Sequence, residues 1–282
     1  MIQEIHSFDE YKGFISGLAE HPLFSDPHFT YDKENLYRSL KSKDEYAFAV
    51  LENGITEGLF VWLVLSDDRY IEMIIGFTRK EEAFSEMLSY MERNYYGYSM
   101  DFVFNPLNAA ISRPLKTKGA IFDPEQQKMI LTGPTPNVST SQIELLSEKW
   151  AKQYCDLHST DTYWTAERIL AAQEKFRVLL AIKDGQVQGY LDVQCCYDIN
   201  EIYALFMKSE AAQQGYELAL LVKAIELNRP NQMMVVVDVD AKAEIELYTA
   251  AGFDRLEGQN SITASYQVRG ITREFETIVD RR

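Results

Sequence analysis

The segment that most constrains this chain is a short turn leading from a strand-like run into a helix. The run Glu201 to Met207 (EIYALFM) comes first, and the turn and helix then read Ala212-Gln213-Gln214-Gly215-Tyr216-Glu217-Leu218-Ala219-Leu220-Leu221. The first turn of a helix leaves several backbone N–H groups without intrahelical acceptors, and the helix dipole adds partial positive charge there. Because a glycine also allows a ligand to approach closely, the turn is typical of a phosphate or pyrophosphate site.

A buried strand and a second helix follow this turn along the chain. Met233 to Asp238 (MMVVVD) is a continuous apolar run, as expected for a parallel strand that is buried on both faces. The next helical pattern, Ala241 to Phe253 (AKAEIELYTAAGF), contains Tyr248 and stops at Gly252, a usual helix terminator. The chain therefore contains five elements in a defined order: a strand, a glycine turn, a helix, a buried strand and a helix ending in LYxxxGF.

This order resembles the Gcn5-related N-acetyltransferases, the GNAT family. In that family the turn reads Arg or Gln, two variable residues, Gly, one variable residue, then Gly or Ala, and it binds the pyrophosphate of acetyl-coenzyme A. Gly215 matches the first glycine, and Leu220-Leu221 match the paired leucines of the next helix. Ala212 replaces the Arg or Gln, and Glu217 replaces the second small residue. Because such a cradle works through backbone N–H groups, losing the side chain at position 212 is compatible with binding.

The resemblance implies roles for individual residues. Acetyl transfer to an amine needs a base, a polarised thioester carbonyl and an acid for the departing thiolate. The resemblance makes Tyr248 the acid and Glu201 the base, with a packing tyrosine and a solvated strand-end carboxylate as the alternative interpretations. Asp198 is a weaker candidate for the base, and a backbone N–H near Phe206 to Lys208 is expected to polarise the carbonyl. The expected coenzyme-binding residues are Phe206, Met207, Lys208, Ala212, Gln213, Gln214, Gly215, Tyr216, Glu217 and Leu218.

Composition limits the partners and the compartment. The net charge of −15 argues against nucleic acid and mildly favours a cationic substrate such as an amine, although solubility alone is the simpler explanation. No apolar stretch approaches the roughly 20 residues that span a bilayer, and the acidic N-terminus differs from a signal sequence. Three cysteines form no disulfide framework and no metal-ligand spacing, and His158 beside Cys155 lacks a third partner. We therefore expect a cytoplasmic protein that binds neither a metal nor a membrane.

The N-terminal half repeats the order of elements of the C-terminal half. Gly119 corresponds to Gly252 at an offset of 133 residues, and Asn108 corresponds to Ala241 at the same offset. The strand-to-helix turn of the N-terminal half, Thr78 to Glu82, has no glycine and ends in two acids. The sequence therefore predicts a degenerate copy that lacks the anion cradle.

A segment rich in Pro, Ser and Thr, Thr132 to Ser141, separates the halves. We predict an α/β protein with two tandem GNAT-like domains, each a mixed, mostly antiparallel sheet flanked by helices. Residues 1–132 form the degenerate domain, and residues 133–282 form the catalytic domain that binds acyl-coenzyme A. In the C-terminal half we also expect a helix from Ile143 to Tyr154 and a closing strand from Ser261 to Val268.

Three functions fit these features. The leading one moves an acetyl group from acetyl-CoA to the amine of a small molecule or peptide, in a direct ternary complex. The second is a noncatalytic module that binds an acyl-CoA or a partner without turnover, which Ala212, Glu217 and Ala241 favour. A transferase with another acyl-CoA or an aminoacyl donor is the third. An enzyme predicts an open cleft facing Tyr248, whereas a pure binding module predicts a cleft filled by side chains.

Overall fold

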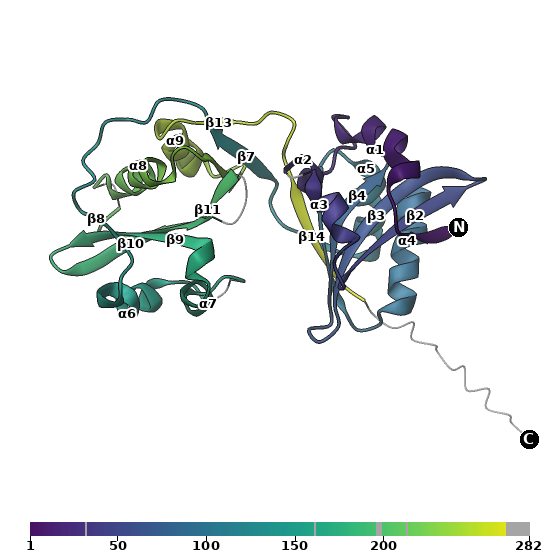
Figure 1. Ribbon diagram of the computed structural model, residues 1–282, viewed down its shortest axis with the longest axis horizontal. Coiled ribbons are helices and arrows are strands. Elements are labelled where there is room, and N and C mark those ends of the chain that lie inside the picture. The colour runs from purple at the N-terminus through teal and green to yellow at the C-terminus, as the bar shows by residue number, and fades with distance from the viewer. Residues whose placement is uncertain (32, 161, 196–198, 213, 269–282) are drawn as a thin grey trace, which may run out of the picture. The chain divides into compact units, whose positions relative to one another are not determined.

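A computed structural model describes the chain except positions 32, 161, 196–198, 213 and 269–282. The chain forms two compact units, one of Met1–Glu125 with the segment from Gly258 on, and one of Gln126–Glu257. Each unit contains one seven-stranded sheet (Figure 1). The predicted fold class, two mixed and mostly antiparallel sheets flanked by helices, is confirmed.

The sheet of the first unit has the strand order β1-β2-β3-β4-β5-β14-β6. Its strands are β1 (Ile2–Ile5), β2 (Glu45–Glu52), β3 (Ile55–Leu65), β4 (Tyr70–Thr78), β5 (Ser99–Phe104), β14 (Ile262–Gln267) and β6 (Ile121–Phe122). The helices are η1 (Asp9–Tyr11), α1 (Lys12–Ala19), α2 (Pro27–Tyr31), α3 (Glu34–Ser39), α4 (Glu81–Asn94) and α5 (Ala109–Lys118). Among the described strands of this sheet, only β4 and β5 pair in parallel, and α4 connects them.

Both faces of this first sheet are covered. Trp62, Phe84 and Phe102 are fully buried in a cluster beneath α4 and α5, and Leu18 and Phe77 are fully buried in a cluster beneath α1 to α3. Alternate strand residues enter alternate clusters, as the two-residue period of a strand requires. The two apolar layers explain why the central strands of this unit contain long apolar runs.

The sheet of the second unit has the order β13-β7-β12-β11-β10-β9-β8. Its strands are β13 (Phe253–Arg255), β7 (Gln126–Leu131), β12 (Gln232–Asp238), β11 (Ile199–Met207), β10 (Gln186–Gln194), β9 (Phe176–Lys183) and β8 (Ile143–Leu145). The helices are α6 (Glu148–Leu157), α7 (Ala166–Ala171), η2 (Gln173–Lys175), α8 (Tyr216–Asn228) and α9 (Lys242–Ala250). Figure 1 shows α8 and α9 on one face of this sheet and α6 and α7 on the other.

Each unit takes one strand from the other half of the sequence. β7 precedes the linker but pairs antiparallel with β12 and β13, while the predicted closing strand, found as β14, pairs with β5 and β6 of the first unit. The chain therefore crosses between units at 125/126 and at 257/258, and not once between 132 and 133. Hydrophobic alternation predicts a strand but carries no information about its partner strand.

One predicted helix is wrong at its start. Ile143–Leu145 forms strand β8, and helix α6 begins only at Glu148, after Ser147 in an extended conformation. Ile143 pairs with Ala181 across the edge of the sheet, and the pairing continues over the next two residues. Pairing with β9 thus overrides a local pattern that also fits a helix.

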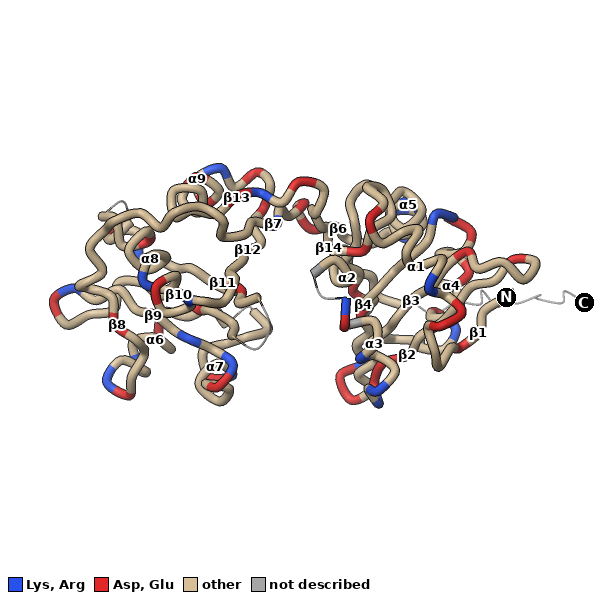
Figure 2. The backbone as a smooth tube through the Cα atoms, turned by 45° about the horizontal axis from the view of Figure 1, so that its top comes forward, with Lys and Arg blue, Asp and Glu red and all other residues tan. Residues whose placement is uncertain are grey.

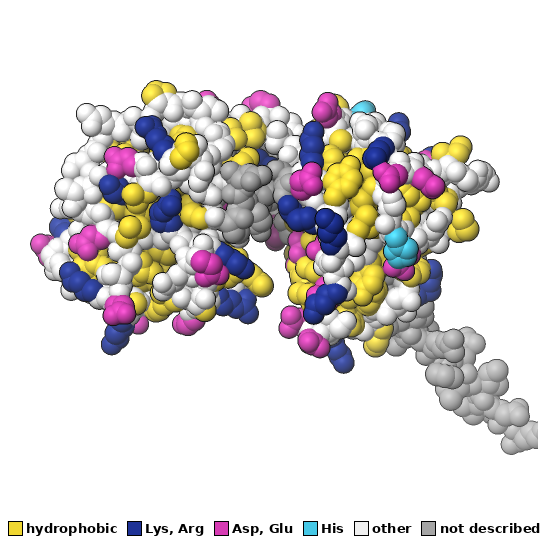
Figure 3. Space-filling model, in the orientation of Figure 1, with side chains coloured by type: hydrophobic (Ala, Val, Ile, Leu, Met, Phe, Trp, Pro, Cys, Tyr) yellow, Lys and Arg dark blue, Asp and Glu magenta, His cyan; other side chains and the backbone are white. Residues whose placement is uncertain are grey.

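Acidic and basic residues are interspersed along the backbone of both units (Figure 2), and side chains of both signs are scattered over the face drawn in Figure 3. Among the residues that the structure describes, no helix is long and apolar enough to cross a membrane.

Candidate active site

The site predicted in the second unit lies where two parallel strands separate. β11 and β12 are in register only from Ile199 to Ile202, opposite Gln232 to Val235. β11 then continues to Met207, still paired with β10 on its other edge. Its register with β10 shifts at Tyr203, a bulge that bends the strand. Beyond this point the two strands diverge, and their facing backbone groups no longer pair with each other.

A cavity of about 720 Å³ lies where the two strands diverge. It is lined by the second half of β11, the first turn of α8, the middle of β12 and one side of α9. Of the residues predicted from the sequence, Met207, Gly215, Glu217, Leu218 and Tyr248 line it. The cavity thus joins the predicted anion cradle to the predicted acid within one continuous space.

Gly215 marks the start of α8 at one end of this cavity. Its φ of +84° lies in the left-handed region, and no atom lies within 4 Å of the place that a Cβ would occupy. Among the described residues no side-chain cap is seen, and the first i,i+4 bond of the helix runs from Ala219 N to Gly215 O at 3.1 Å. The N–H groups of the first turn therefore have no intrahelical acceptor and point out of the helix. The positive φ favours glycine here, and the open space beside Gly215 leaves room for a ligand.

The other predicted cradle residues are placed around this turn. Lys208 donates from Nζ to Val187 O at 2.8 Å, and the amide of Ala212 donates to Lys208 O at 3.0 Å. Gln214 bonds to the Lys183 ammonium through its side chain, and Tyr216 is buried in the core. These contacts hold the turn against the ends of β9 and β10. Gln213 lies outside the described residues.

Glu217, in the first turn of α8, also lines the cavity. An acid in the first turn is favoured by the helix dipole. Its negative charge would also repel an anionic ligand at this end of the helix.

Tyr248 lines the opposite side of the cavity from helix α9. Its side chain is only 4% exposed, and its ring packs edge-on against Phe253 with centroids 5.8 Å apart. Burial, and to a lesser degree the Glu244 carboxylate one turn earlier, raises the pKa of the Tyr248 phenol well above its usual 10. The phenol is therefore neutral near pH 7 and holds a proton that it can donate.

Glu201 is on the other face of the sheet from Tyr248. Its neighbour Ile202 packs beneath α8 and α9, and successive strand residues point to opposite faces. Burial lowers the pKa of Lys128 on β7, and the nearby Glu201 carboxylate opposes that shift. Glu201 thus flanks the point of strand separation from the side of α6 and α7. The weaker candidate Asp198 lies outside the described residues.

Phe206, predicted as a coenzyme contact, also lies on the α6 side of the sheet. Its ring stacks on Tyr190, whose other neighbour in the stack is His158, with centroid distances of 5.5 and 4.9 Å. The Phe206 side chain is 37% exposed, so it forms the open end of this row of rings. Its backbone remains next to the cavity, between Leu205 and Met207.

A buried polar network lies on the face of the sheet that α6 covers. Its residues are not among the site residues predicted from the sequence. Asp192 on β10 is fully buried, and its carboxylate accepts from Tyr154 Oη at 3.0 Å and contacts His158 Nε2 at 2.9 Å. Burial lowers the pKa of His158, but its hydrogen bonds to Asp192 and to the Ser159 carbonyl outweigh this and the pKa is raised. An aspartate inside an apolar strand, between Leu191 and Val193, is the sequence signal for this network.

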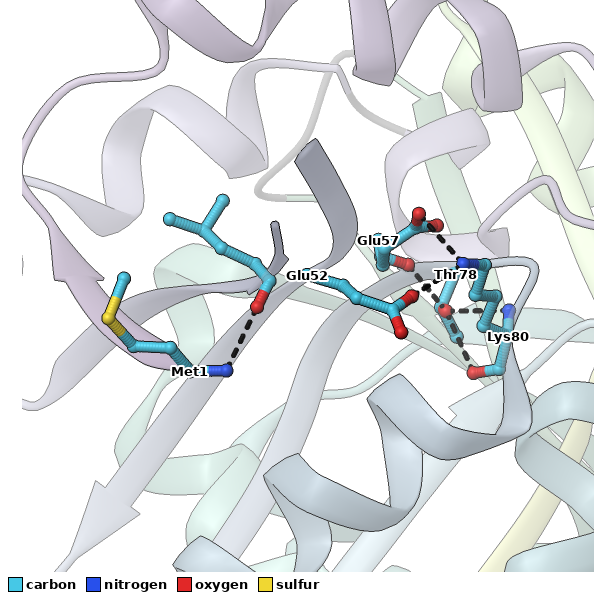
Figure 4. Close-up of polar contacts among 6 residues, drawn as sticks. Met1, Glu52, Glu57, Thr78 and Lys80 are labelled. Atoms are coloured by element: carbon cyan, nitrogen blue, oxygen red, sulfur yellow. Dashed lines mark hydrogen bonds and ion pairs between the residues drawn. The ribbon is translucent and has the colours of Figure 1, made fainter. Parts of the chain in front are cut away.

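The corresponding turn of the first unit is shorter and closed by its own groups (Figure 4). Thr78 Oγ1 accepts from the Lys80 amide at 3.0 Å and donates to Glu57 O at 2.8 Å. Lys80 Nζ lies 2.8 Å from carboxylate oxygens of both Glu52 and Glu57. Asn108 Nδ2 also donates to Thr78 O at 3.3 Å, a link that Ala241 has no side chain to make in the second unit. This turn therefore offers no glycine cradle.

No group of three or more metal-ligating side chains occurs among the described residues.

Neither a protein-family model nor a curated protein sequence matches the chain. Solved structures do match its fold. A Gcn5-related N-acetyltransferase from Sphaerobacter thermophilus has a TM-score of 0.60 and 14% identity, with 84% of this chain and 86% of that chain covered. A tandem GNAT protein from the clavulanic acid biosynthesis pathway has a TM-score of 0.56 and 10% identity, with 96% and 99% covered.

A Gcn5-related N-acetyltransferase from Kribbella flavida is similar at a TM-score of 0.52 and 12% identity, over 86% of this chain and 95% of that one. At such identities the likeness concerns the fold. The match to the tandem protein extends over nearly the whole of both chains, as two consecutive copies require. The chain therefore has the tandem fold of the Gcn5-related N-acetyltransferases, as its sequence motifs predict.

Proposed function

We propose that the second unit transfers an acetyl group from the thioester of acetyl-CoA to an amine. The observation that carries the proposal is the open cavity of about 720 Å³ between β11 and β12, with Gly215 at one end and Tyr248 on its wall. A scaffold that had lost its ligand has no reason to keep this volume open, because packed side chains would stabilise the fold more. The general class also agrees with the acetyltransferase-type structures that share the fold.

The shape of the cavity suits the parts of coenzyme A. The pyrophosphate would accept from the first-turn N–H groups of α8, where Gly215 leaves space. The amide-containing arm would lie along the free edge of β11 after Ile202 and pair with its backbone as an added strand does. The thioester would then reach the part of the cavity lined by Tyr203 and Tyr248.

The two predicted catalytic residues suit opposite proton transfers. Glu201, directly or through water, would take a proton from the acceptor's ammonium group, and the free amine would attack the thioester carbon. The C–S bond breaks as the C–N bond forms, and Tyr248 gives its proton to the departing thiolate sulfur. Their placement on opposite faces of the sheet separates the base on the acceptor side from the acid on the coenzyme side.

The acceptor would approach from the side of α6 and α7, opposite α8. There the loop between these helices meets β11 through Thr162 Oγ1 and Tyr203 Oη, 2.7 Å apart, and through the Trp164 amide, 3.3 Å from Tyr203 Oη. The net charge of −15 favours an acceptor that arrives as a cation, such as a small-molecule or peptide amine, over a nucleic acid. A cytoplasmic location, where acetyl-CoA is made available, completes the proposal.

A noncatalytic acyl-CoA-binding module is the second candidate, and Glu217 favours it. Glu217 lines the cavity in the first turn of α8, where a pyrophosphate would bind, and the cap position of α9 holds Ala241. Both candidates predict coenzyme binding, so turnover separates them. Loss of binding altogether would contradict both.

The test combines two measurements on the full chain. Calorimetry with acetyl-CoA and with coenzyme A should give one site per chain, because only the second unit has the glycine turn. A free-thiol assay with acetyl-CoA and a panel of small and peptide amines should then show amine-dependent release. Binding without release from any amine would favour the module, and two sites of equal affinity would contradict the assignment to one unit.

A further inference from the structure

A second cavity in the Gln126–Glu257 unit lies away from the acyl-transfer site. It has a volume of about 650 Å³ and lies between the loop that follows β8, helix α7 with η2, and the first residues of β9. None of its lining residues also lines the cavity that contains Tyr248. Its size is within the range of pockets that hold small molecules.

Arg177, on β9, lines this cavity and has an unusual environment. Its Nη1 atom is buried and has no hydrogen-bond partner among the described residues. A guanidinium group stays protonated in proteins and presents five N–H donors. A buried donor without an acceptor is costly, and native proteins seldom keep one without a ligand, ion or water to satisfy it.

The rest of the lining indicates what kind of acceptor is missing. The walls are mainly apolar and include Leu146, Ile169, Leu170 and Phe176. Glu148 and Glu174 also line the cavity, and both are exposed. These two acids disfavour a phosphate, which carries more charge than a carboxylate. A carboxylate matches the planar fork of a guanidinium through two parallel hydrogen bonds.

From these observations we infer that this cavity is a binding site for a small carboxylate with an apolar body. The carboxylate bonds to Arg177, the body packs against the apolar wall, and the exposed Glu148 and Glu174 leave room for an ammonium group at the opening. Simple aliphatic acids and apolar amino acids both have a carboxylate and an apolar body, so both classes fit this description. This site is independent of the proposed acetyl transfer.

Three probes with similar apolar bodies test which charged group the site recognises. L-Leucine carries both charged groups, 4-methylpentanoate lacks the ammonium, and 3-methylbutylamine lacks the carboxylate. Each is titrated into the full chain by calorimetry and by thermal denaturation. We expect at least one of the two carboxylates to bind and to raise the melting temperature by about 3–6 °C at ten times its dissociation constant. The amine should do neither. Stabilisation by the amine alone, or by none of the three at millimolar concentration, would overturn the inference.

The matched variants are Arg177→Met and Lys175→Met. Lys175 is exposed in η2, two residues away, and does not line the cavity. Arg177→Met should weaken carboxylate binding at least tenfold, and Lys175→Met should leave it unchanged. Because Arg177→Met removes a buried donor that lacks an acceptor, the ligand-free variant should melt at or above the temperature of the wild type.

A structural arginine predicts the reverse result. Removing a guanidinium that already had its partners would lower the melting temperature of the ligand-free protein by several degrees. That outcome, or unchanged carboxylate binding in Arg177→Met, would contradict the inference. A second variant, Arg177→Lys, keeps the positive charge but loses the planar guanidinium that makes two parallel hydrogen bonds. It should bind the carboxylate with intermediate affinity.

Discussion

Strand β7 provides a demanding prediction, because it precedes the linker in sequence but belongs to the second sheet. A fragment of residues 126–257 contains β7, whereas a fragment of residues 133–282 lacks it. β7 pairs with β12 at five positions and with β13 at three, and Met129 in its middle is fully buried. We therefore expect only the first fragment to fold by itself.

The size of the effect follows from these contacts. About five hydrogen bonds to β12, each with a net contribution of about 1 kcal/mol, amount to about 5 kcal/mol. Loss of a buried methionine side chain adds about 2–5 kcal/mol. The sum of about 7–10 kcal/mol is comparable with the whole free energy of unfolding of a typical domain, about 5–15 kcal/mol.

Thermal denaturation followed by circular dichroism and tryptophan fluorescence measures this difference. Both fragments contain Trp150 and Trp164, so they share the same fluorescent probes. Residues 126–257 should unfold in one cooperative transition and bind coenzyme A. Residues 133–282 should show no cooperative transition and no binding. If both fragments melt cooperatively within a few degrees of each other, the pairing of β7 with β12 and β13 does not stabilise the second unit as we describe.

Three further predictions concern single residues. Gly215→Asp should weaken coenzyme A binding by about 2–4 kcal/mol in calorimetry. The control Gly185→Asp, in a hairpin turn with a similar positive φ, should not weaken it. Equal affinities of the wild type and Gly215→Asp for coenzyme A would contradict the assignment of the anion cradle. Glu217→Gly should bind coenzyme A as tightly as the wild type or more tightly, and a large loss would contradict the view that this acid opposes the ligand. Asp192→Asn should destabilise the protein by about 1–3 kcal/mol in urea denaturation. Because the raised pKa of His158 makes its contribution complete below about pH 6.5, that cost should be largest near pH 6 and should shrink as the pH rises through the folded-state pKa. A cost independent of pH would contradict the His158–Asp192 pairing.

The order of helices and strands was predictable because most elements have strong local signals. The Asp184-Gly185 hairpin, the apolar run of β12 and the glycine after α9 each identify one element without tertiary information. The position of β14 was predictable too, but its pairing was not. Strand periodicity fixes which residues share a face, whereas the choice of sheet depends on contacts between distant segments.

The site was predictable where backbone conformation dictates a residue, as at Gly215. The point of strand separation after Ile202, and the cavity wall formed by Tyr203 and Leu205, were not, because they depend on how β11 and β12 diverge in space. The opposite orientation of Glu201 and Tyr248 also follows from the sheet and not from their spacing. Asp192 had a local signal, a charged residue within an apolar strand, which indicates burial but not its partners.

The rate of thiol release from acetyl-CoA in the presence of an acceptor amine, compared between wild type and Tyr248→Phe, tests the central claim most directly. The phenol is neutral, buried and on the cavity wall, so its removal should lower the rate by about 10²- to 10⁴-fold, as is typical for a lost general acid. Calorimetry should show the affinity for acetyl-CoA nearly unchanged. Equal rates in the two proteins, or no amine-dependent release by the wild type with any acceptor, would contradict the proposed acetyl transfer.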